Sequence, residues 1–161
     1  MPNMAHGPQV KAFEEVMRMP PAGTSPIGYR SYDYGKDQGD QAGAQLSNPL
    51  EFTKENLMRG QTVYNTYCIV CHGERGQGDG YIVPKFPRPP TLHSDKVRDW
   101  SDGRIFHVIT AGQNLMPAYE AQIRPEDRWA IVKYVRVLQR AEKPTPQDVE
   151  ELKKILKEGK L

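Results

Sequence analysis

The five-residue segment Cys68-Ile69-Val70-Cys71-His72 constrains this chain more than any other part of its sequence. The chain has no other cysteines than these two, and two residues separate them. Cysteines at this spacing lie about one helical turn apart, so they suit a disulfide, a redox-active dithiol or a covalent cofactor anchor. A histidine directly after the second cysteine is typical of the third possibility, the attachment of a c-type haem.

The haem interpretation gives each residue of the segment a chemical role. Cys68 and Cys71 would form thioethers with the two vinyl groups along one edge of the macrocycle, and His72 would bind the iron. A redox dithiol does not need His72, and it is expected in a βαβ context that this sequence lacks. A zinc site needs two further ligands at finger-like spacing, and His93 and His107 are too far apart for that. We therefore predict one covalent haem c.

The length and charge of the chain limit its domain organisation and the kinds of partner it can bind. A chain of 161 residues holds one domain with a sizeable core or a smaller domain with tails, and the second arrangement fits this sequence better. The net charge of +2 comes from well-mixed charged residues, so no nucleic acid is expected as a partner. No apolar run approaches the roughly 20 residues that span a bilayer, and no signal peptide is recognisable. We expect a soluble chain whose native precursor carries an export signal.

The N-terminal third predicts little regular structure. Residues 9–19 form a short amphipathic pattern that begins after Pro8 and stops at Pro20, so we expect a helix there. Residues 20–49 are rich in Pro, Gly, Asp, Gln and Ser, which disfavours helices and strands. A disordered linker and an extended arm are both compatible with this composition. The arm is favoured because the segment carries three tyrosines, Tyr29, Tyr32 and Tyr34.

Four segments after residue 52 carry clearer signals. Thr53 caps a helix that leads into Cys68, and a loop rich in glycine and proline follows the motif. A second helix runs from Ser101 to Gly112. The strongest apolar periodicity covers residues 125–140, which should be the most buried helix. A final helix follows the 144–146 break, with Thr145 as its N-cap and Pro146 at its first position, and with Val149, Leu152, Ile155 and Leu156 as its apolar residues.

The sixth iron ligand separates a closed electron carrier from an open haem site. Met58 lies on a helix, where a methionine most often fills the core. His93 and His107 could each be a ligand, although a lone histidine is more often solvated or hydrogen-bonded. Met116 is favoured because it lies in a loop, directly before Pro117, where a thioether has no obvious packing role. Methionine opposite histidine raises the reduction potential and leaves no open iron site, so we expect a carrier and not an enzyme.

Residues 53–139 resemble the class I cytochromes c. The resemblance implies an all-α fold, a class I cytochrome c fold around one covalent haem. In that family a helix glycine lets the N- and C-terminal helices approach closely, and the corresponding residues are Gly60, Tyr64, Ile131 and Tyr134. The family also orients its haem histidine with a proline carbonyl, which Pro84 or Pro87 would supply to His72.

A narrower likeness is to the monohaem cytochrome c subunit of bacterial alternative complex III, a membrane quinol-oxidising complex. It rests on the Pro20–Thr24 turn, Asn48-Pro49-Leu50, the glycine-rich stretch after His72, Arg88-Pro89-Pro90, Met116-Pro117 and Asp127-Arg128-Trp129-Ala130. The likeness implies other cytochrome and iron-sulfur subunits as partners, with a downstream oxidase or soluble carrier as acceptor. It also implies a periplasmic location or the outer face of the cytoplasmic membrane. Membrane association would come through the complex or through an N-terminal lipid anchor not seen in this sequence.

The combined prediction has three parts. Residues 1–52 are an N-terminal extension, 53–141 the haem domain and 142–161 a C-terminal helical tail. A free periplasmic cytochrome and, less favoured, an open-site haem enzyme or ligand sensor are the alternative functions. Docking is expected at the exposed haem edge. Five basic residues could surround this edge: Lys85, Arg88, Lys96, Arg98 and Arg104. Because Asp95, Asp99 and Asp102 are interleaved with them, a solvated surface of mixed charge is an equally good interpretation. Arg88, Trp100 and Arg104 are candidate partners of the haem propionates.

Overall fold

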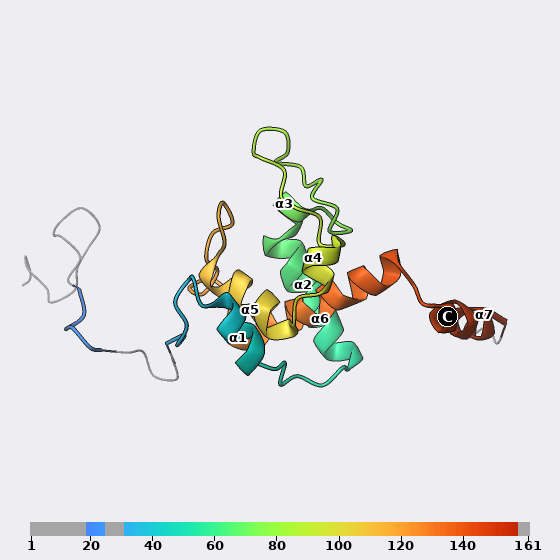
Figure 1. Ribbon diagram of the computed structural model, residues 1–161, viewed down its shortest axis with the longest axis horizontal. Coiled ribbons are helices and arrows are strands. Elements are labelled where there is room, and N and C mark those ends of the chain that lie inside the picture. Colours follow the sequence, from blue (N-terminus) through green and yellow to red (C-terminus); the bar gives the residue numbers. More distant parts are fainter. Residues whose placement is uncertain (1–18, 25–30, 158–161) are drawn as a thin grey trace, which may run out of the picture. The chain divides into compact units, whose positions relative to one another are not determined.

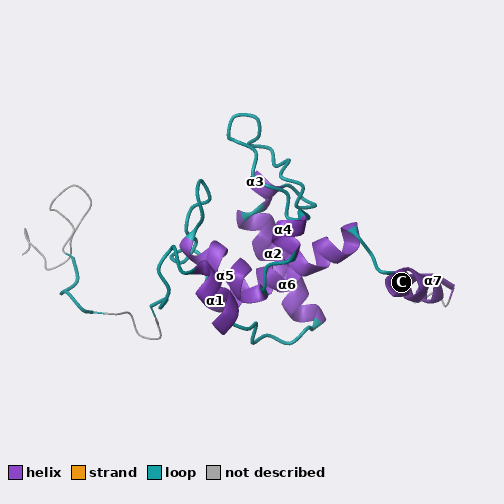
Figure 2. Ribbon diagram, in the orientation of Figure 1, coloured by secondary structure: helices purple, strands orange, loops and turns teal. Residues whose placement is uncertain are grey.

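The structure is a computed structural model that describes residues 19–24 and 31–157. The chain divides into two compact units, residues 1–32 and residues 33–161, and each unit is treated by itself. The described part of residues 33–161 is helical without strands (Figures 1 and 2). Its helices are α1 (Gly39–Gln45), α2 (Lys54–Tyr67), α3 (Ile69–His72), α4 (Asp95–Arg98), α5 (Asp102–Ala111), α6 (Pro125–Glu142) and α7 (Pro146–Lys157). The all-α prediction is confirmed for these residues.

None of the described helices combines the length and the apolar character that crossing a membrane requires.

α2 begins where the capping pattern predicts. The Thr53 hydroxyl accepts a hydrogen bond from the backbone N–H of Asn56 at 3.2 Å, which satisfies one of the unpaired donors of the first turn. The helix ends at Tyr67, and α3 begins two residues later, at Ile69. The predicted helix leading into Cys68 is therefore confirmed, and it delivers the motif at its C-terminal end.

α5 and α6 supply most of the buried apolar side chains. Trp129 of α6 stacks on Phe106 of α5 with 4.0 Å between the ring centroids. The buried apolar residues of α6 are Trp129, Ala130, Ile131, Val132 and Val135. This confirms the expectation that residues 125–140 form a deeply buried helix, which the structure extends to Glu142.

The segment before Leu46 is helical, which differs from its prediction. Residues 39–45, expected to be part of an irregular arm, form α1, which packs against α5. Small residues allow the contact: a Cβ on Gly103 of α5 would lie 2.7 Å from the carbonyl oxygen of Ala42. The Ser101 hydroxyl donates to the carbonyl of Gly43 at 2.7 Å. Tertiary packing and this polar contact stabilise a helix that its glycine-rich composition disfavours.

The other helix predictions have mixed outcomes. The helix proposed for residues 9–19 lies almost wholly outside the described residues. α7 begins at Pro146 as predicted, and Thr145 and Asp148 form a reciprocal cap: the Asp148 N–H donates to the Thr145 hydroxyl at 3.2 Å and the Thr145 N–H donates to the Asp148 carboxylate at 2.9 Å. The short helix α4, within the loop region after His72, had no clear signal in the sequence.

Candidate functional site

The Cys-x-x-Cys-His segment forms its own short helix at the end of α2. Cys68 is the C-terminal cap of α2, and α3 carries Cys71 and His72. The His72 N–H donates to the Cys68 carbonyl at 2.9 Å, so the segment keeps one helical turn between its first and last members. Neither cysteine forms a disulfide. Both sulfurs thus remain available to a cofactor attached along one side of the turn.

A cavity of about 480 Å³ opens in front of this segment. Its walls come from the end of α2, from α3, from the proline-rich loop after His72, and from α5, α6 and the turn after α5. The four residues predicted to hold the haem, Cys68, Cys71, His72 and Met116, all line it. Most of the other lining side chains are apolar or aromatic, as in ligand cavities of this size.

His72 has the properties of a metal ligand. Burial lowers the pKa of its imidazole, which keeps the ring neutral at physiological pH. Its Nδ1 atom is buried without a hydrogen-bond partner. The expected acceptor, the carbonyl of Pro84 or Pro87, therefore does not form a hydrogen bond with Nδ1 in this structure.

The thiol of Cys68 is poorly suited to redox or zinc chemistry. Burial and the neighbouring Cys71 raise its pKa to about 12, so the thiol stays protonated at neutral pH. Both a catalytic dithiol and a structural zinc site need a thiolate. Among the described residues, no group of three His, Cys, Asp or Glu side chains could hold a metal ion. The cavity, the neutral imidazole and the two thiols together fit a covalent haem.

Met116 reaches the cavity from a tight backbone turn. The N–H of Gln113 donates to the carbonyl of Met116 at 3.1 Å, and the N–H of Met116 donates back to the carbonyl of Gln113 at 2.9 Å. Asn114 has a φ of 50° and Gly112 a φ of 74°. A Cβ on Gly112 would lie 2.6 Å from the carbonyl oxygen of Met116. Glycine is therefore required where the turn leaves α5, and the turn fixes the methionine by its backbone.

The loop after His72 folds back onto the motif. Gly73, Gly76 and Gly78 all have φ values between 74° and 76°, which favour glycine. The N–H of Gly78 donates to the carbonyl of His72 at 2.8 Å, and the buried hydroxyl of Tyr64 donates to the carbonyl of Gly73 at 2.8 Å. The predicted role of these glycines in a shaped loop is confirmed.

The other candidate ligands do not line the cavity. His93 is buried, and its Nε2 is 2.6 Å from the carbonyl oxygen of Arg75. His107 is buried as well, and its Nε2 is 3.1 Å from the carbonyl oxygen of Lys36. Both histidines hold a backbone segment in place. The expectation that Met58 fills the core is wrong, because its side chain points to solvent and is 57% exposed.

The three propionate candidates are placed differently. Arg88 and Trp100 line the cavity, whereas Arg104 does not. Arg88 is already engaged, since its Nε donates to the carbonyl of Gly78 at 3.0 Å. The Arg104 guanidinium lies over the Trp100 ring at 5.3 Å and forms an ion pair with Asp40 at 3.2 Å. Trp100 is therefore the candidate that lines the cavity and whose side chain is not hydrogen-bonded to a loop carbonyl, as that of Arg88 is.

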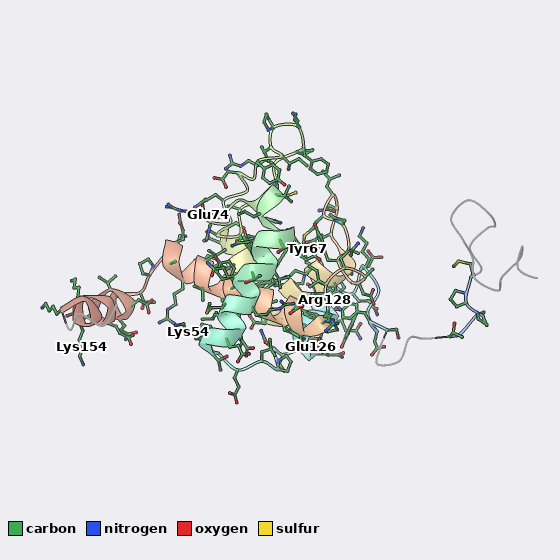
Figure 3. The ribbon with its side chains drawn as sticks, turned by 180° about the vertical axis from the view of Figure 1, so that it is seen from behind. Lys54, Tyr67, Glu74, Glu126, Arg128 and Lys154 are labelled. Carbon is green, nitrogen blue, oxygen red and sulfur yellow. The ribbon has the colours of Figure 1, made fainter. Side chains whose placement is uncertain are left out.

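Sequence reasoning missed the apolar rim of the cavity. Phe86 and Leu115 line the cavity and are 41% and 65% exposed. Phe86 belongs to the proline-rich loop and Leu115 to the methionine turn. The sequence did contain a signal for this rim: large apolar side chains inside loops rich in glycine and proline. Such residues do not lie on the buried face of a helix, so another role is expected for them. Tyr67, labelled at the end of α2 in Figure 3, also lines the cavity and meets Tyr119 edge to face at 6.2 Å.

Comparisons with known proteins show which family the chain resembles. The family model described as cytochrome C oxidase, cbb3-type, subunit III, matches residues 55–135. A thiosulfate dehydrogenase of Thiomonas intermedia is 26% identical over 82% of this chain and 45% of that protein. The cbb3-type cytochrome c oxidase subunit CcoP of Azospirillum brasilense is 26% identical over 72% of this chain and 42% of that protein. The chain thus spans less than half the length of either curated relative.

A solved structure is also similar. It is the Kuenenia stuttgartiensis reducing HAO-like protein complex Kustc0457/Kustc0458, with a TM-score of 0.49 and 27% identity over 56% of this chain and 46% of that chain.

Proposed function

Because the chain belongs to the cytochrome c family of cbb3-type oxidase subunit III, which binds covalent haem c, we propose that it is a closed monohaem electron carrier. In the proposed site Cys68 and Cys71 would form the thioethers, and His72 and Met116 would bind the iron. The observation that carries the proposal is that these four residues line one cavity. When bound, haem c supplies a one-electron couple between ferric and ferrous iron.

The residues around the cavity would favour electron transfer over catalysis. Apolar walls limit the access of water to the haem, and a thioether ligand favours the ferrous state. With His72 and Met116 both bound, no position on the iron is left for a substrate. The chain would then accept and release electrons without changing a bound molecule.

We further propose that the carrier is a subunit of a membrane quinol-oxidising complex like alternative complex III. The likeness in the motifs outside the haem domain supports this. The chain would lie in the periplasm or on the outer face of the cytoplasmic membrane. Its partners would be other cytochrome and iron-sulfur subunits, and an oxidase or a soluble carrier would accept its electrons.

Transient partners would dock at the apolar rim formed by Phe86 and Leu115. The basic residues expected around this rim have other contacts in part: Arg88 binds loop carbonyls and Arg104 binds Asp40. We therefore propose a docking surface whose centre is apolar, as in the cores of protein interfaces.

A catalytic alternative comes from the thiosulfate dehydrogenase relative. An enzyme or a ligand sensor that works at the iron needs an iron position that opens. Carbon monoxide tests this directly. We expect that the reduced, haem-loaded protein near neutral pH does not bind carbon monoxide rapidly, because Met116 occupies the sixth position. Rapid stoichiometric binding by the native protein would overturn the closed-carrier proposal.

Complex membership needs a separate experiment. We expect the full-length native protein to copurify with membranes from its source cells and to leave them together with quinol-oxidising activity. A native pool that is entirely free in the periplasm would instead favour the diffusible cytochrome.

A further inference from the structure

One wall of the cavity is built from a segment with little regular structure. Residues 92–102 connect the proline-rich loop to α5, and their only complete helix is the four-residue α4. Leu92, Val97 and Trp100 of this segment line the cavity. A wall with so few helical hydrogen bonds of its own needs other contacts to keep its shape.

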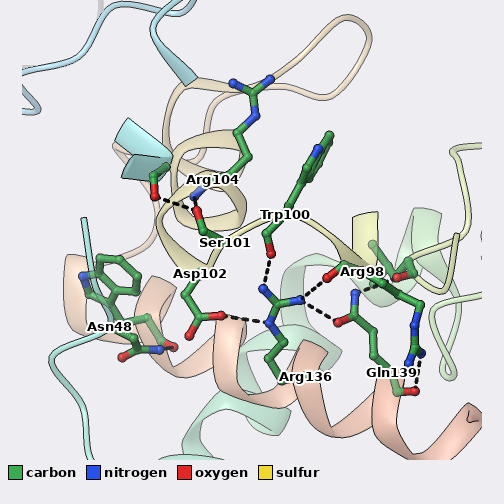
Figure 4. Close-up of polar contacts among 11 residues, drawn as sticks. Asn48, Arg98, Trp100, Ser101, Asp102, Arg104, Arg136 and Gln139 are labelled. Carbon is green, nitrogen blue, oxygen red and sulfur yellow. Dashed lines mark hydrogen bonds and ion pairs between the residues drawn. The ribbon is translucent and has the colours of Figure 1, made fainter. Parts of the chain in front are cut away.

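Arg136 of α6 supplies three of those contacts (Figure 4). Its Nε donates to the Asp102 carboxylate at 2.8 Å, and its Nη1 donates to the carbonyl of Arg98 at 3.2 Å. Its Nη2 donates to the carbonyl of Trp100. The planar guanidinium thus joins α6 to three residues of the wall at once.

Gln139, one turn later on α6, completes the attachment. Its side-chain oxygen accepts from Arg136 Nη1 at 2.9 Å, and its Nε2 donates to the carbonyl of Leu92 at 2.8 Å. Its own carbonyl accepts from Arg98 at 2.7 Å. Gln139 is 4% exposed, so these groups have little access to water that could replace a lost partner.

The Trp100 ring is held from a second direction. Arg104 of α5 lies over it at 5.3 Å, and Arg104 is itself paired with Asp40 of α1. The carbonyl of Trp100 is bound by Arg136 (Figure 4), while its ring has the Arg104 guanidinium as a neighbour. Release of the carbonyl would free the backbone that carries an indole in the cavity wall.

We propose that Arg136 is a positioning residue for electron transfer: it holds the Trp100 wall of the haem cavity in place and thereby helps to set the reduction potential. A loosened wall admits water, and a polar environment stabilises the more highly charged ferric site. This positioning depends on the geometry of the guanidinium and not on its charge alone. Lysine keeps the positive charge but cannot donate to the Asp102, Arg98 and Trp100 oxygens together.

The test compares two substitutions at Arg136 with a matched pair elsewhere. Arg136→Lys keeps the charge and Arg136→Gln removes it. Arg59 offers the control, since it donates to Asp127 at 2.6 Å through two nitrogens and joins α2 to α6 without lining the cavity. Arg59→Lys and Arg59→Gln therefore disturb an arginine–carboxylate pair that also joins α6 to another part of the domain.

The measurements are the reduction potential, the Soret circular dichroism of the haem-loaded protein, and far-UV circular dichroism with denaturant unfolding to confirm the fold. We expect both Arg136 variants to lower the potential by similar amounts and to change the Soret signal. We expect both Arg59 variants to lower stability with the potential unchanged.

Two outcomes would overturn the proposal. If Arg136→Lys keeps the wild-type potential while Arg136→Gln shifts it, charge and not position is responsible. If neither Arg136 variant shifts the potential more than the Arg59 variants, Arg136 has only a structural role. The proposal rests on haem binding, and the haem content of the wild-type protein is measured first. A wild-type protein without covalent haem would refute the proposed function, independently of Arg136.

Discussion

Gly60 of α2 lies directly against the backbone of Ala130 in α6. A Cβ added to Gly60 would be 2.2 Å from the carbonyl oxygen of Ala130, a distance that real Cβ atoms do not adopt. The helices therefore cross with their backbones in near contact. This crossing confirms the close approach that the resemblance to class I cytochromes c implied, and it places the end of α2 beside α6, where both helices line the cavity.

Gly60→Ala should destabilise the protein by about 1–3 kcal/mol, because the added methyl forces the two helices apart. The better helix propensity of alanine offsets only part of this cost. Denaturant unfolding of the haem-loaded protein measures the difference. Gly35→Ala is the control, since a Cβ there would meet only the flexible Gln38 side chain at 3.4 Å. Equal stability of the two variants would contradict the close crossing.

Met116→Ala should abolish the weak far-red charge-transfer band of the ferric protein and permit carbon monoxide binding to the ferrous protein. The reduction potential should fall by a sizeable part of the roughly 0.8 V that axial ligands span. Optical spectra and a redox titration measure these changes. Met58→Ala, at a side chain 57% exposed to solvent, should leave all three properties unchanged. A band that persists in Met116→Ala would refute the assignment of this ligand.

Tyr64→Phe should destabilise the protein by about 0.5–1.5 kcal/mol, since it removes a buried hydrogen bond to the carbonyl of Gly73, which keeps only the N–H of Gly76 as a donor. Tyr64 is 1% exposed, so water has little access to replace the hydroxyl. Tyr81→Phe is the matched control, because Tyr81 is 82% exposed. Thermal unfolding distinguishes the two. A Tyr64→Phe protein as stable as Tyr81→Phe would show that this bond contributes nothing.

The Arg59–Asp127 pair predicts a pH dependence. Its hydrogen bond from Arg59 is the main reason that the pKa of Asp127 lies below its usual value. The pair therefore contributes stability above the unfolded pKa of about 4, and this contribution is lost as the pH falls through the lower folded pKa. We expect the wild type to lose stability more steeply below pH 4 than Asp127→Asn does, as measured by denaturant unfolding across this range. Parallel curves for the two proteins would contradict this coupling.

The haem motif and the main helices could be predicted from local patterns. Thr53 marked the start of α2 through its cap, and the spacing of apolar residues marked α6. The adjacent cysteine and histidine in Cys71-His72 indicated the cofactor without any tertiary information, because the haem attachment motif consists of residues that are contiguous in the chain. Met116 was favoured for a local reason too, since a methionine in a loop before proline has no helix face to fill.

Other residues had no role that local patterns could show. His93 and His107 were open candidates as ligands, and only the folded chain places their Nε2 atoms on the carbonyls of Arg75 and Lys36. Met58 was expected in the core because a methionine on a helix most often fills the core, yet the buried side of that helix is formed by residues such as Gly60 and Tyr64.

By itself, the sequence predicted the covalent chemistry of the Cys68 to His72 segment, because that chemistry depends on residues adjacent in the chain. It also predicted the helices that carry the segment, because the spacing of their apolar residues is helical. Tertiary structure alone decided that α1 packs on α5 and that Arg136 binds the Trp100 wall. It also joined His72 and Met116 in one cavity. These relationships connect residues far apart in the chain, and their energies depend on burial and hydrogen-bond geometry that exist only after the helices have packed.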